Sequence, residues 1–176
     1  YLDAAVGGIR GARPAGAFYF HVSDPLARID SDLNAEAEAE ILRQLQMKGV
    51  VLADDDVLRA MDQGEEPIAI PAALTRGGGV RKDARALDAT QMDALLLHAR
   101  SQAAELAESL YAGNTDILPV QEGDTLQCER CDYGGICGFD ADARGAQARE
   151  LPEMSLDELR ERLSGTPESA AANAGD

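Results

Sequence analysis

Apolar residues recur along this chain at two different periods, which separate the expected helices from the expected strands. Helical spacing is longest over residues 89–112, where a stripe of apolar side chains predicts an amphipathic helix with a buried face. Asp88 and Gln91 can cap the start of this helix, and Gly113 suits its end. The predicted buried stripe consists of Met92, Leu95, Leu96, Ala99, Ala103, Leu106 and Leu110.

Two shorter helices are predicted in the first third of the chain. Residues 1–5 read as the last turns of one helix, and residues 34–49 read as a second. Asn34 can cap the second helix, and the pair Lys48-Gly49 suits its end.

Aromatic and β-branched residues predict strands in the first half of the chain. Residues 16–22 read as a strand, and residues 67–81 read as two short strands around a glycine-rich turn. Residues 50–63 combine an apolar run, an acidic cap and a short helix. The aspartates at positions 54–56 allow a metal-site reading, but their place before an apolar helix favours the capping role.

The end of the chain predicts one more helix and a tail. Residues 154–165 follow helical spacing and open with a capping box between Ser155 and Glu158. Residues 166–176 are rich in Ala, Gly, Ser and Glu, and we expect them to form a disordered tail.

The composition is that of one modest folded domain. Hydrophobic residues make up 45% of the 176 residues, which suffices for a core, although aromatic residues are only 4% and tryptophan is absent. No apolar run approaches the roughly 20 residues that span a bilayer, and no signal peptide opens the chain, so we expect a cytoplasmic protein. Because the first residue is not Met, we expect the chain to be a fragment of a longer protein.

The charge balance limits where nucleic acid can bind. A net charge of −16 argues against a nucleic-acid-binding surface spread over the whole chain, because phosphate binding needs Lys and Arg. Salt adaptation accounts for the acidity equally well. The densest basic group is expected on a solvated turn, where it is a candidate contact for a nucleic-acid backbone, and it consists of Arg76, Arg81, Lys82 and Arg85.

All three cysteines lie in one short segment, "CERCDYGGIC", at residues 128–137. A disulfide framework would leave one of Cys128, Cys131 and Cys137 unpaired, and nothing indicates secretion. Metal ligation accounts for all three, because the close Cys128–Cys131 pair can reach one centre and the glycines before Cys137 let the backbone wrap. A zinc ion takes a fourth Cys or His, whereas an iron–sulfur cluster usually takes a fourth Cys.

The chain does not supply an evident fourth ligand. It has no further cysteine, and its two histidines, His21 and His98, are distant in sequence from the cysteines. We expect each histidine to be an ordinary strand or helix residue. The fourth ligand is therefore expected upstream of Tyr1, and the spacing alone leaves iron–sulfur and zinc both open.

Three segments together resemble one family, the B subunit of the AddAB/RexAB-type ATP-dependent helicase–deoxyribonuclease. "PAGAFYFHVSDPL" at residues 14–26 is similar to the strand that follows the nuclease core of that family. "LQMKGVVLADDDVLRAMD" at residues 45–62 is similar to a second segment of that family, and "CERCDYGGICGFD" at residues 128–140 is similar to its C-terminal cysteine segment. The resemblance covers nearly all of residues 1–150.

The resemblance implies an α/β, helix-rich fold that forms the C-terminal portion of a restriction-endonuclease-like nuclease domain of the PD-(D/E)XK type. It implies that Cys128, Cys131, Cys137 and one distant upstream cysteine hold a structural 4Fe-4S cluster. It also implies DNA as the substrate, an AddA/RexA-type A subunit as the heterodimer partner, Mg²⁺ at the nuclease site of the full-length protein, and a role in repair of double-strand breaks by recombination. By the same resemblance, Tyr1 would lie near the DNA-facing side of the active site.

The chain departs from the family pattern in the residues that carry catalysis. The nuclease motif, an Asp followed by an acid-x-Lys on adjacent strands, should precede Tyr1, and no such pattern occurs here in a strand–turn–strand setting. We therefore expect no catalytic residue within the chain and no DNA cleavage by the chain alone. The alternative function is that of a non-catalytic binding module whose fold is held together by zinc or by an iron–sulfur cluster.

Overall fold

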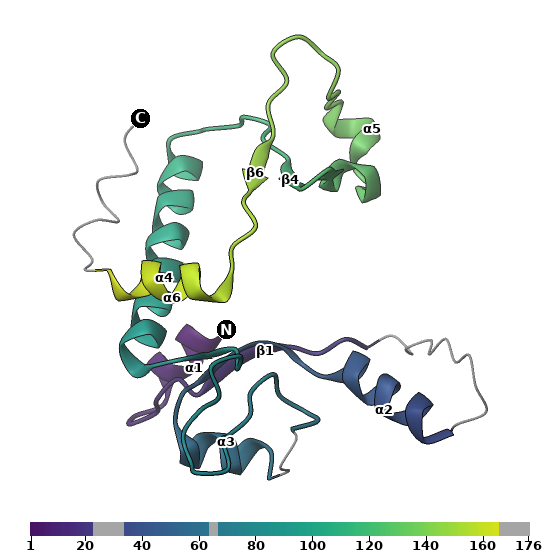
Figure 1. Ribbon diagram of the computed structural model, residues 1–176. Coiled ribbons are helices and arrows are strands. Elements are labelled where there is room, and N and C mark those ends of the chain that lie inside the picture. Colours follow the sequence, from purple (N-terminus) through teal and green to yellow (C-terminus); the bar gives the residue numbers. More distant parts are fainter. Residues whose placement is uncertain (23–33, 64–66, 166–176) are drawn as a thin grey trace. The chain divides into compact units, whose positions relative to one another are not determined.

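The computed structural model describes residues 1–22, 34–63 and 67–165, apart from the side chains of residues 34–36 and 130. These residues form a mixed α/β structure with six α-helices and two small three-stranded sheets (Figure 1). The mixed α/β class expected from the sequence is therefore confirmed. The predicted tail at the C-terminus lies outside the described residues.

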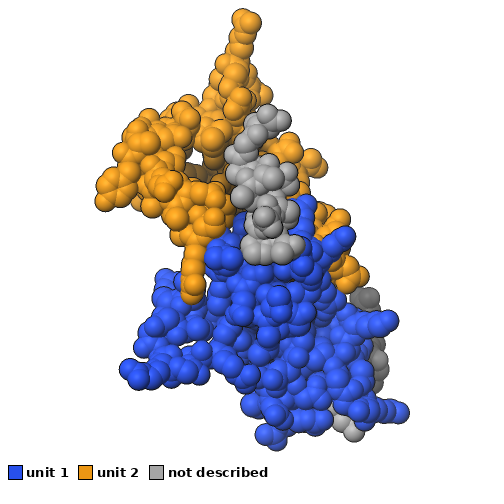
Figure 2. All heavy atoms as spheres, turned by 90° about the vertical axis from the view of Figure 1, so that its left-hand side faces the viewer, with its two compact units in different colours: residues 1–98, 160–176 blue, residues 99–159 orange. Residues whose placement is uncertain are grey.

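The chain divides into two compact units, which Figure 2 shows in different colours. Unit 1 combines Tyr1–His98 with the C-terminal segment Arg160–Asp176, and unit 2 is Ala99–Leu159. Unit 2 is thus inserted in the sequence between two parts of unit 1.

The sheet of unit 1 is built around one central strand. Strand β2 (Lys48–Leu52) pairs antiparallel with β1 (Gly16–Tyr19) and parallel with β3 (Ala86–Leu87). The predicted strand at residues 16–22 is confirmed for its first four residues. Val51 is fully buried on the central strand of this sheet, so the apolar half of β2 is part of the core.

Two clusters of buried side chains pack around this sheet, and both belong to unit 1. One cluster includes Val51, Leu58 and Ile70. The other is made of Leu52, Leu87 and Met92, with Leu163 packed against it. The helices that supply these side chains are α3 (Asp55–Met61), α4 (Ala89–Tyr111) and α6 (Leu156–Ser164). Helix α1 (Leu2–Gly8) adds Leu2 to the second cluster.

Helix α2 (Asn34–Leu45) is shorter than predicted, and the expected helix end is part of a strand instead. Lys48 and Gly49 open β2, where Gly49 is the register partner of Phe18. Gly49 has a φ of +152°, and a Cβ at this position would lie 2.0 Å from the backbone oxygen of Ala17. The glycine is therefore required by the pairing of β2 with β1, and it does not end a helix. The side chain of Asn34, the predicted cap, lies outside the described residues.

The predicted N-terminal caps of α3, α4 and α6 are confirmed in the structure. Asp54 Oδ1 accepts from the backbone N–H groups of Asp56 and Val57 at 3.0 and 3.2 Å, so the acidic run starts α3 as a cap. At the start of α4, the Gln91 N–H donates to Asp88 Oδ1 at 2.8 Å, and the Asp88 N–H donates to Gln91 Oε1 at 3.0 Å.

The capping box of α6 is formed in the same reciprocal way. The Ser155 N–H donates to Glu158 Oε2 at 2.7 Å, and the Glu158 N–H donates to Ser155 Oγ at 3.3 Å. Each box satisfies two N–H groups that a helix start would otherwise leave without partners.

The predicted buried stripe of α4 is wrong beyond its first two turns. Met92 is fully buried, and Leu95 and Leu96 are half-buried. The remaining stripe positions are exposed, namely Ala99, Ala103, Leu106 and Leu110. The helix is continuous, but only its N-terminal part packs on the core of unit 1.

The two strands predicted at residues 67–81 are also wrong, although the turn between them is confirmed. A single antiparallel bridge joins Leu74 to Val80, and no ladder forms on either side of it in the described part of this segment. Gly78 and Gly79 both have a φ of +84°, a conformation that other residues rarely adopt. The glycines therefore make the turn tight.

Unit 2 contains the second sheet and the cysteine segment. Strand β4 (Val120–Glu122) pairs antiparallel with β5 (Thr125–Leu126) and parallel with β6 (Arg149–Leu151). Among the side chains that the structure describes in unit 2, none is buried. The described part of unit 2 is therefore held by backbone hydrogen bonds between its strands and within its turns. In the described part of the chain, no helix is long and apolar enough to span a bilayer.

Candidate metal centre and nucleic-acid interface

The cysteine segment folds as a series of tight turns. A 3₁₀ helix (η1, Gln127–Arg130) carries Cys128, and a short helix (α5, Gly134–Cys137) ends with Cys137. The Cys131 N–H donates to the Cys128 carbonyl at 3.2 Å, and the Gly134 N–H donates to the Cys131 carbonyl at 3.3 Å. The backbone of this segment is therefore tightly turned.

The three thiols are free, but this chain does not bring them together into a metal site. Cys128 is half-buried, whereas Cys131 and Cys137 are exposed. In the described residues, no group of three or more His, Cys, Asp or Glu side chains is arranged to hold a metal ion. His21 and His98 are both exposed. The donor types suit a soft metal, but their arrangement in this chain does not form a complete site.

Three of the four residues of the predicted basic group, Arg76, Arg81 and Lys82, lie on a hairpin that we call the basic hairpin, residues 73–82. The Arg81 N–H donates to the Ala73 carbonyl at 2.9 Å, and the Thr75 N–H donates to the Gly79 carbonyl at 2.9 Å. Arg76 lies in the turn closed by these two hydrogen bonds, and its side chain is exposed. The solvated turn expected from the sequence is confirmed.

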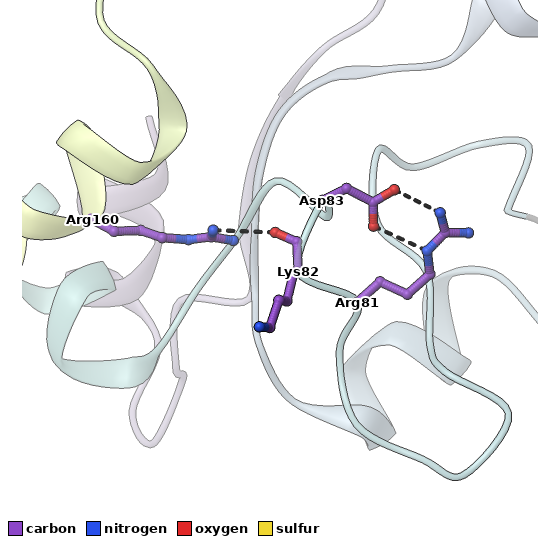
Figure 3. A network of polar contacts seen from close by, with 4 residues as sticks. All are labelled: Arg81, Lys82, Asp83 and Arg160. Atoms are coloured by element: carbon purple, nitrogen blue, oxygen red, sulfur yellow. Dashed lines mark hydrogen bonds and ion pairs between the residues drawn. The ribbon is translucent and has the colours of Figure 1, made fainter.

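Two of the four basic side chains are engaged by neighbouring groups. Arg81 donates to both carboxylate oxygens of Asp83, from Nε at 3.0 Å and from Nη2 at 2.6 Å (Figure 3). These hydrogen bonds lower the pKa of the Asp83 carboxyl below its ordinary value of 3.8. Arg85 Nε donates to the Gly49 carbonyl at 3.2 Å, so this guanidinium contacts the central strand of the sheet.

Lys82 is exposed, and Figure 3 shows its ammonium group directed away from both Asp83 and Arg160. Arg76 and Lys82 are therefore the two members of the basic group whose charged ends no hydrogen bond or ion pair holds within the described part of the chain.

Tyr1, the other predicted nucleic-acid contact, is fully exposed at the start of α1. Its carbonyl accepts from the Ala5 N–H at 2.9 Å as the first bond of the helix, and its side chain makes no capping hydrogen bond. Its role in DNA binding stays a prediction.

The structure identifies one contact that the sequence did not indicate. The Arg160 guanidinium donates to the carbonyls of Ala84 at 2.7 Å and of Lys82 at 3.3 Å, and also to the carbonyl of Ala86. The acceptors are backbone groups 74 to 78 residues earlier in the chain. No residue pattern marks a carbonyl as an acceptor, so this contact had no signal in the sequence.

The acid-x-Lys pattern of the expected nuclease motif does not occur in the sequence. Lys48 and Lys82 are the only lysines of the chain, and the residues two positions before them are Gln46 and Val80. No acid-x-Lys pattern therefore exists anywhere in these 176 residues.

Comparisons with known proteins give a consistent picture, although no family model matches the chain. It is 36% identical over 152 residues to the B subunit of the ATP-dependent helicase/deoxyribonuclease of Alkaliphilus metalliredigens, which covers 85% of this chain and 13% of that protein. It is 36% identical over 168 residues to the corresponding B subunit of Desulforudis audaxviator, covering 94% of this chain and 14% of that protein. The B subunit of Clostridium perfringens is 28% identical over 169 residues, covering 90% and 15%.

Identity at this level over most of the chain makes it homologous to subunits of ATP-dependent helicase/deoxyribonucleases. Within that class the chain is homologous to a part of the B subunit, which confirms the resemblance seen in the sequence. The chain spans about 13–15% of the length of the curated relatives it matches.

Proposed function

We propose that this chain is a part of the B subunit of an AddAB/RexAB-type helicase–nuclease that processes the ends of broken DNA for recombinational repair. The observation that carries the proposal is the 36% identity over 152 residues to the B subunit of an ATP-dependent helicase/deoxyribonuclease. The A subunit of the same enzyme is the expected partner, and duplex DNA with a free end is the expected substrate.

Within that B subunit, the chain forms the C-terminal part of the restriction-endonuclease-like nuclease domain. The carboxylates that bind Mg²⁺ and activate water belong to another part of the protein. The absence of any acid-x-Lys pattern among the 176 residues supports this division of roles. What this chain adds is a folded α/β unit with a basic hairpin, followed by a cysteine-bearing unit.

The three cysteines hold part of a structural 4Fe-4S cluster, and a fourth ligand comes from outside this chain. Support comes from the free state of Cys128, Cys131 and Cys137 and from the tight turns that join them. The lack of a buried side chain in the described part of unit 2 supports it as well. A small unit without a core usually needs a metal or a covalent link to stay folded.

The contacts to DNA are assigned to Tyr1, Arg76, Arg81 and Lys82. All four side chains are exposed, and three of them lie on the basic hairpin of an otherwise acidic chain. Arg81 is engaged by Asp83, so Arg76 and Lys82 are the stronger contacts of the hairpin.

The test is DNA degradation by the complete B subunit purified together with its A subunit. We expect degradation of linear duplex DNA that requires both ATP and Mg²⁺, and no degradation of closed circular duplex. The 176-residue chain alone should cleave neither. A complete complex that leaves linear DNA intact would refute the proposed function. Cleavage by the isolated chain that EDTA abolishes would show that the nuclease site lies within it.

A further inference from the structure

The basic hairpin is held in place by an acidic residue from another element. The carboxylate Oδ2 of Asp55, in the first turn of α3, accepts from the Gly79 N–H at 3.1 Å. Asp55 is half-buried, and the two residues are 24 positions apart in sequence. This hydrogen bond ties the turn of the hairpin to the core helix.

The base of the hairpin is held as well. Arg160 donates to the carbonyl of Lys82, and Arg81 is paired with Asp83 (Figure 3). The hairpin is therefore fixed at its turn by Asp55 of α3 and at its base by Arg160 of α6. Both residues belong to unit 1.

The charge of this segment is opposite to that of the rest of the chain. Residues 76–85 contain four basic residues and one acidic residue, in a chain whose net charge is −16. Within it, Gly77 has no atom within 4 Å of where a Cβ would be, so the turn is open on that side. A polyanion can approach the backbone of the turn closely there, as well as the exposed Arg76 side chain.

We propose that the basic hairpin is a preformed binding element for the phosphate backbone of duplex DNA, and that Asp55 is its positioning residue. The inference rests on the proposed function only for the choice of DNA as the polyanion. Asp55 contacts no phosphate itself. It keeps the turn at the place where Arg76 reaches the backbone of the duplex.

The positioning role and the charge of Asp55 predict opposite changes in DNA affinity when Asp55 is replaced. Asp55 is an anion beside a phosphate-binding surface, so its removal would strengthen DNA binding by about two-fold if only Coulomb repulsion mattered. Its removal also frees the Gly79 N–H and the turn. If positioning dominates, Asp55→Ala weakens DNA binding although it makes the protein less acidic.

Two further variants separate the hydrogen bond from the charge. Asp55→Asn keeps an oxygen that can accept from the Gly79 N–H and removes the charge, so it should bind DNA at least as tightly as the wild type. Asp56→Ala is the matched control. Asp56 is the next residue in the same helix turn, is exposed, and forms no side-chain hydrogen bond or ion pair within the described residues.

The experiment measures binding of the full 176-residue chain to a fluorescein-labelled, mixed-sequence duplex by anisotropy, at several salt concentrations and without ATP. One lost phosphate contact reduces the salt slope by about 0.9, which corresponds to about eight-fold weaker binding at about 0.1 M salt. We expect that loss for Arg76→Ala. For Asp55→Ala we expect about three- to eight-fold weaker binding with a reduced slope. Asp56→Ala should match the wild type or bind slightly more tightly.

The outcomes that overturn the inference are distinct from those that overturn the proposed function. Tighter binding by Asp55→Ala, or equal weakening by Asp55→Asn, would refute the positioning role. An unchanged salt slope in Arg76→Ala, or no DNA binding by the wild-type chain, would refute the binding element. Thermal midpoints and circular dichroism identify a variant that fails to fold. If Asp55→Ala does not fold, the DNA affinities of Asp55→Asn and Asp56→Ala still test the positioning role. None of these results depends on ATP-dependent DNA degradation by the complete complex.

Discussion

Replacing Arg160 by Ala tests whether α6 holds the segment that leads from the basic hairpin into β3. The guanidinium donates to the carbonyls of Ala84 at 2.7 Å, of Ala86 at 3.1 and 3.2 Å, and of Lys82 at 3.3 Å. Ala84 and Ala86 are both buried, so their carbonyls have little access to water. The substitution removes every one of these hydrogen bonds at once.

The magnitude follows from the carbonyls of the two buried residues, Ala84 and Ala86. A hydrogen bond to a charged group contributes about 1.5–3 kcal/mol, but these bonds share one side chain whose rotamers must be fixed at a cost of about 2 kcal/mol. The carbonyl of Lys82 is exposed and adds little. We therefore expect Arg160→Ala to lower the free energy of unfolding by about 1–4 kcal/mol, and the thermal midpoint by about 2–16 °C.

The assay is urea and thermal unfolding followed by far-UV circular dichroism. Arg162→Ala is the matched control, because Arg162 is exposed on the same helix and forms no hydrogen bond or ion pair within the described residues. Its effect should stay within about 0.5 kcal/mol. Arg160→Lys should recover only part of the loss, since one ammonium cannot reach all three carbonyls. Equal effects of Arg160→Ala and Arg162→Ala would refute the reasoning.

Two other predictions concern the ion pair and the cysteines. Because hydrogen bonds from Arg81 lower the pKa of Asp83 below 3.8, the pair contributes stability above that pH and loses it as the pH falls through the lowered pKa. Asp83→Asn should therefore destabilise the chain at neutral pH and not at the lowest pH, and a pH-independent difference in unfolding would contradict this. In the complete B subunit purified without oxygen, Cys131→Ser should reduce the iron content and expose the chain to protease from about residue 114 onward, because metal binding is coupled to folding. An unchanged iron content and protease pattern would show that the cysteines do not bind a cluster that holds this segment folded.

Local signals in the sequence were reliable wherever the partner groups lie within one helical turn. The capping pairs at Asp88 and at Ser155 form as predicted, and Asp54 caps α3 as the favoured interpretation of the acidic run requires. Each cap joins a side chain to an N–H group two or three residues later. The sequence therefore contains both partners of the interaction at a fixed spacing.

Periodicity identified α4 but did not determine how much of it is buried. The stripe from Met92 to Leu110 has the spacing of a packed face, yet only its first positions meet the core of unit 1. Burial depends on whether another element covers the face, and spacing contains no information on that. Gly49 is a second case. The sequence around it predicts a helix end, but the close approach of β1 is what requires the glycine, and the sequence does not show which strand lies beside it.

The sequence by itself determined the family relationship, the cysteine spacing, the lack of an acid-x-Lys pattern and the position of the basic group. Only the tertiary structure showed how that basic group is held. Asp55 and Arg160 reach it from helices that are distant in sequence, and both bind backbone groups. Asp55 accepts from the Gly79 N–H, and Arg160 donates to the carbonyls of Lys82, Ala84 and Ala86. Every residue except proline carries the same backbone N–H, and every residue carries the same carbonyl. Which of them a distant side chain contacts is decided by the fold, because the residue types do not distinguish one backbone group from another.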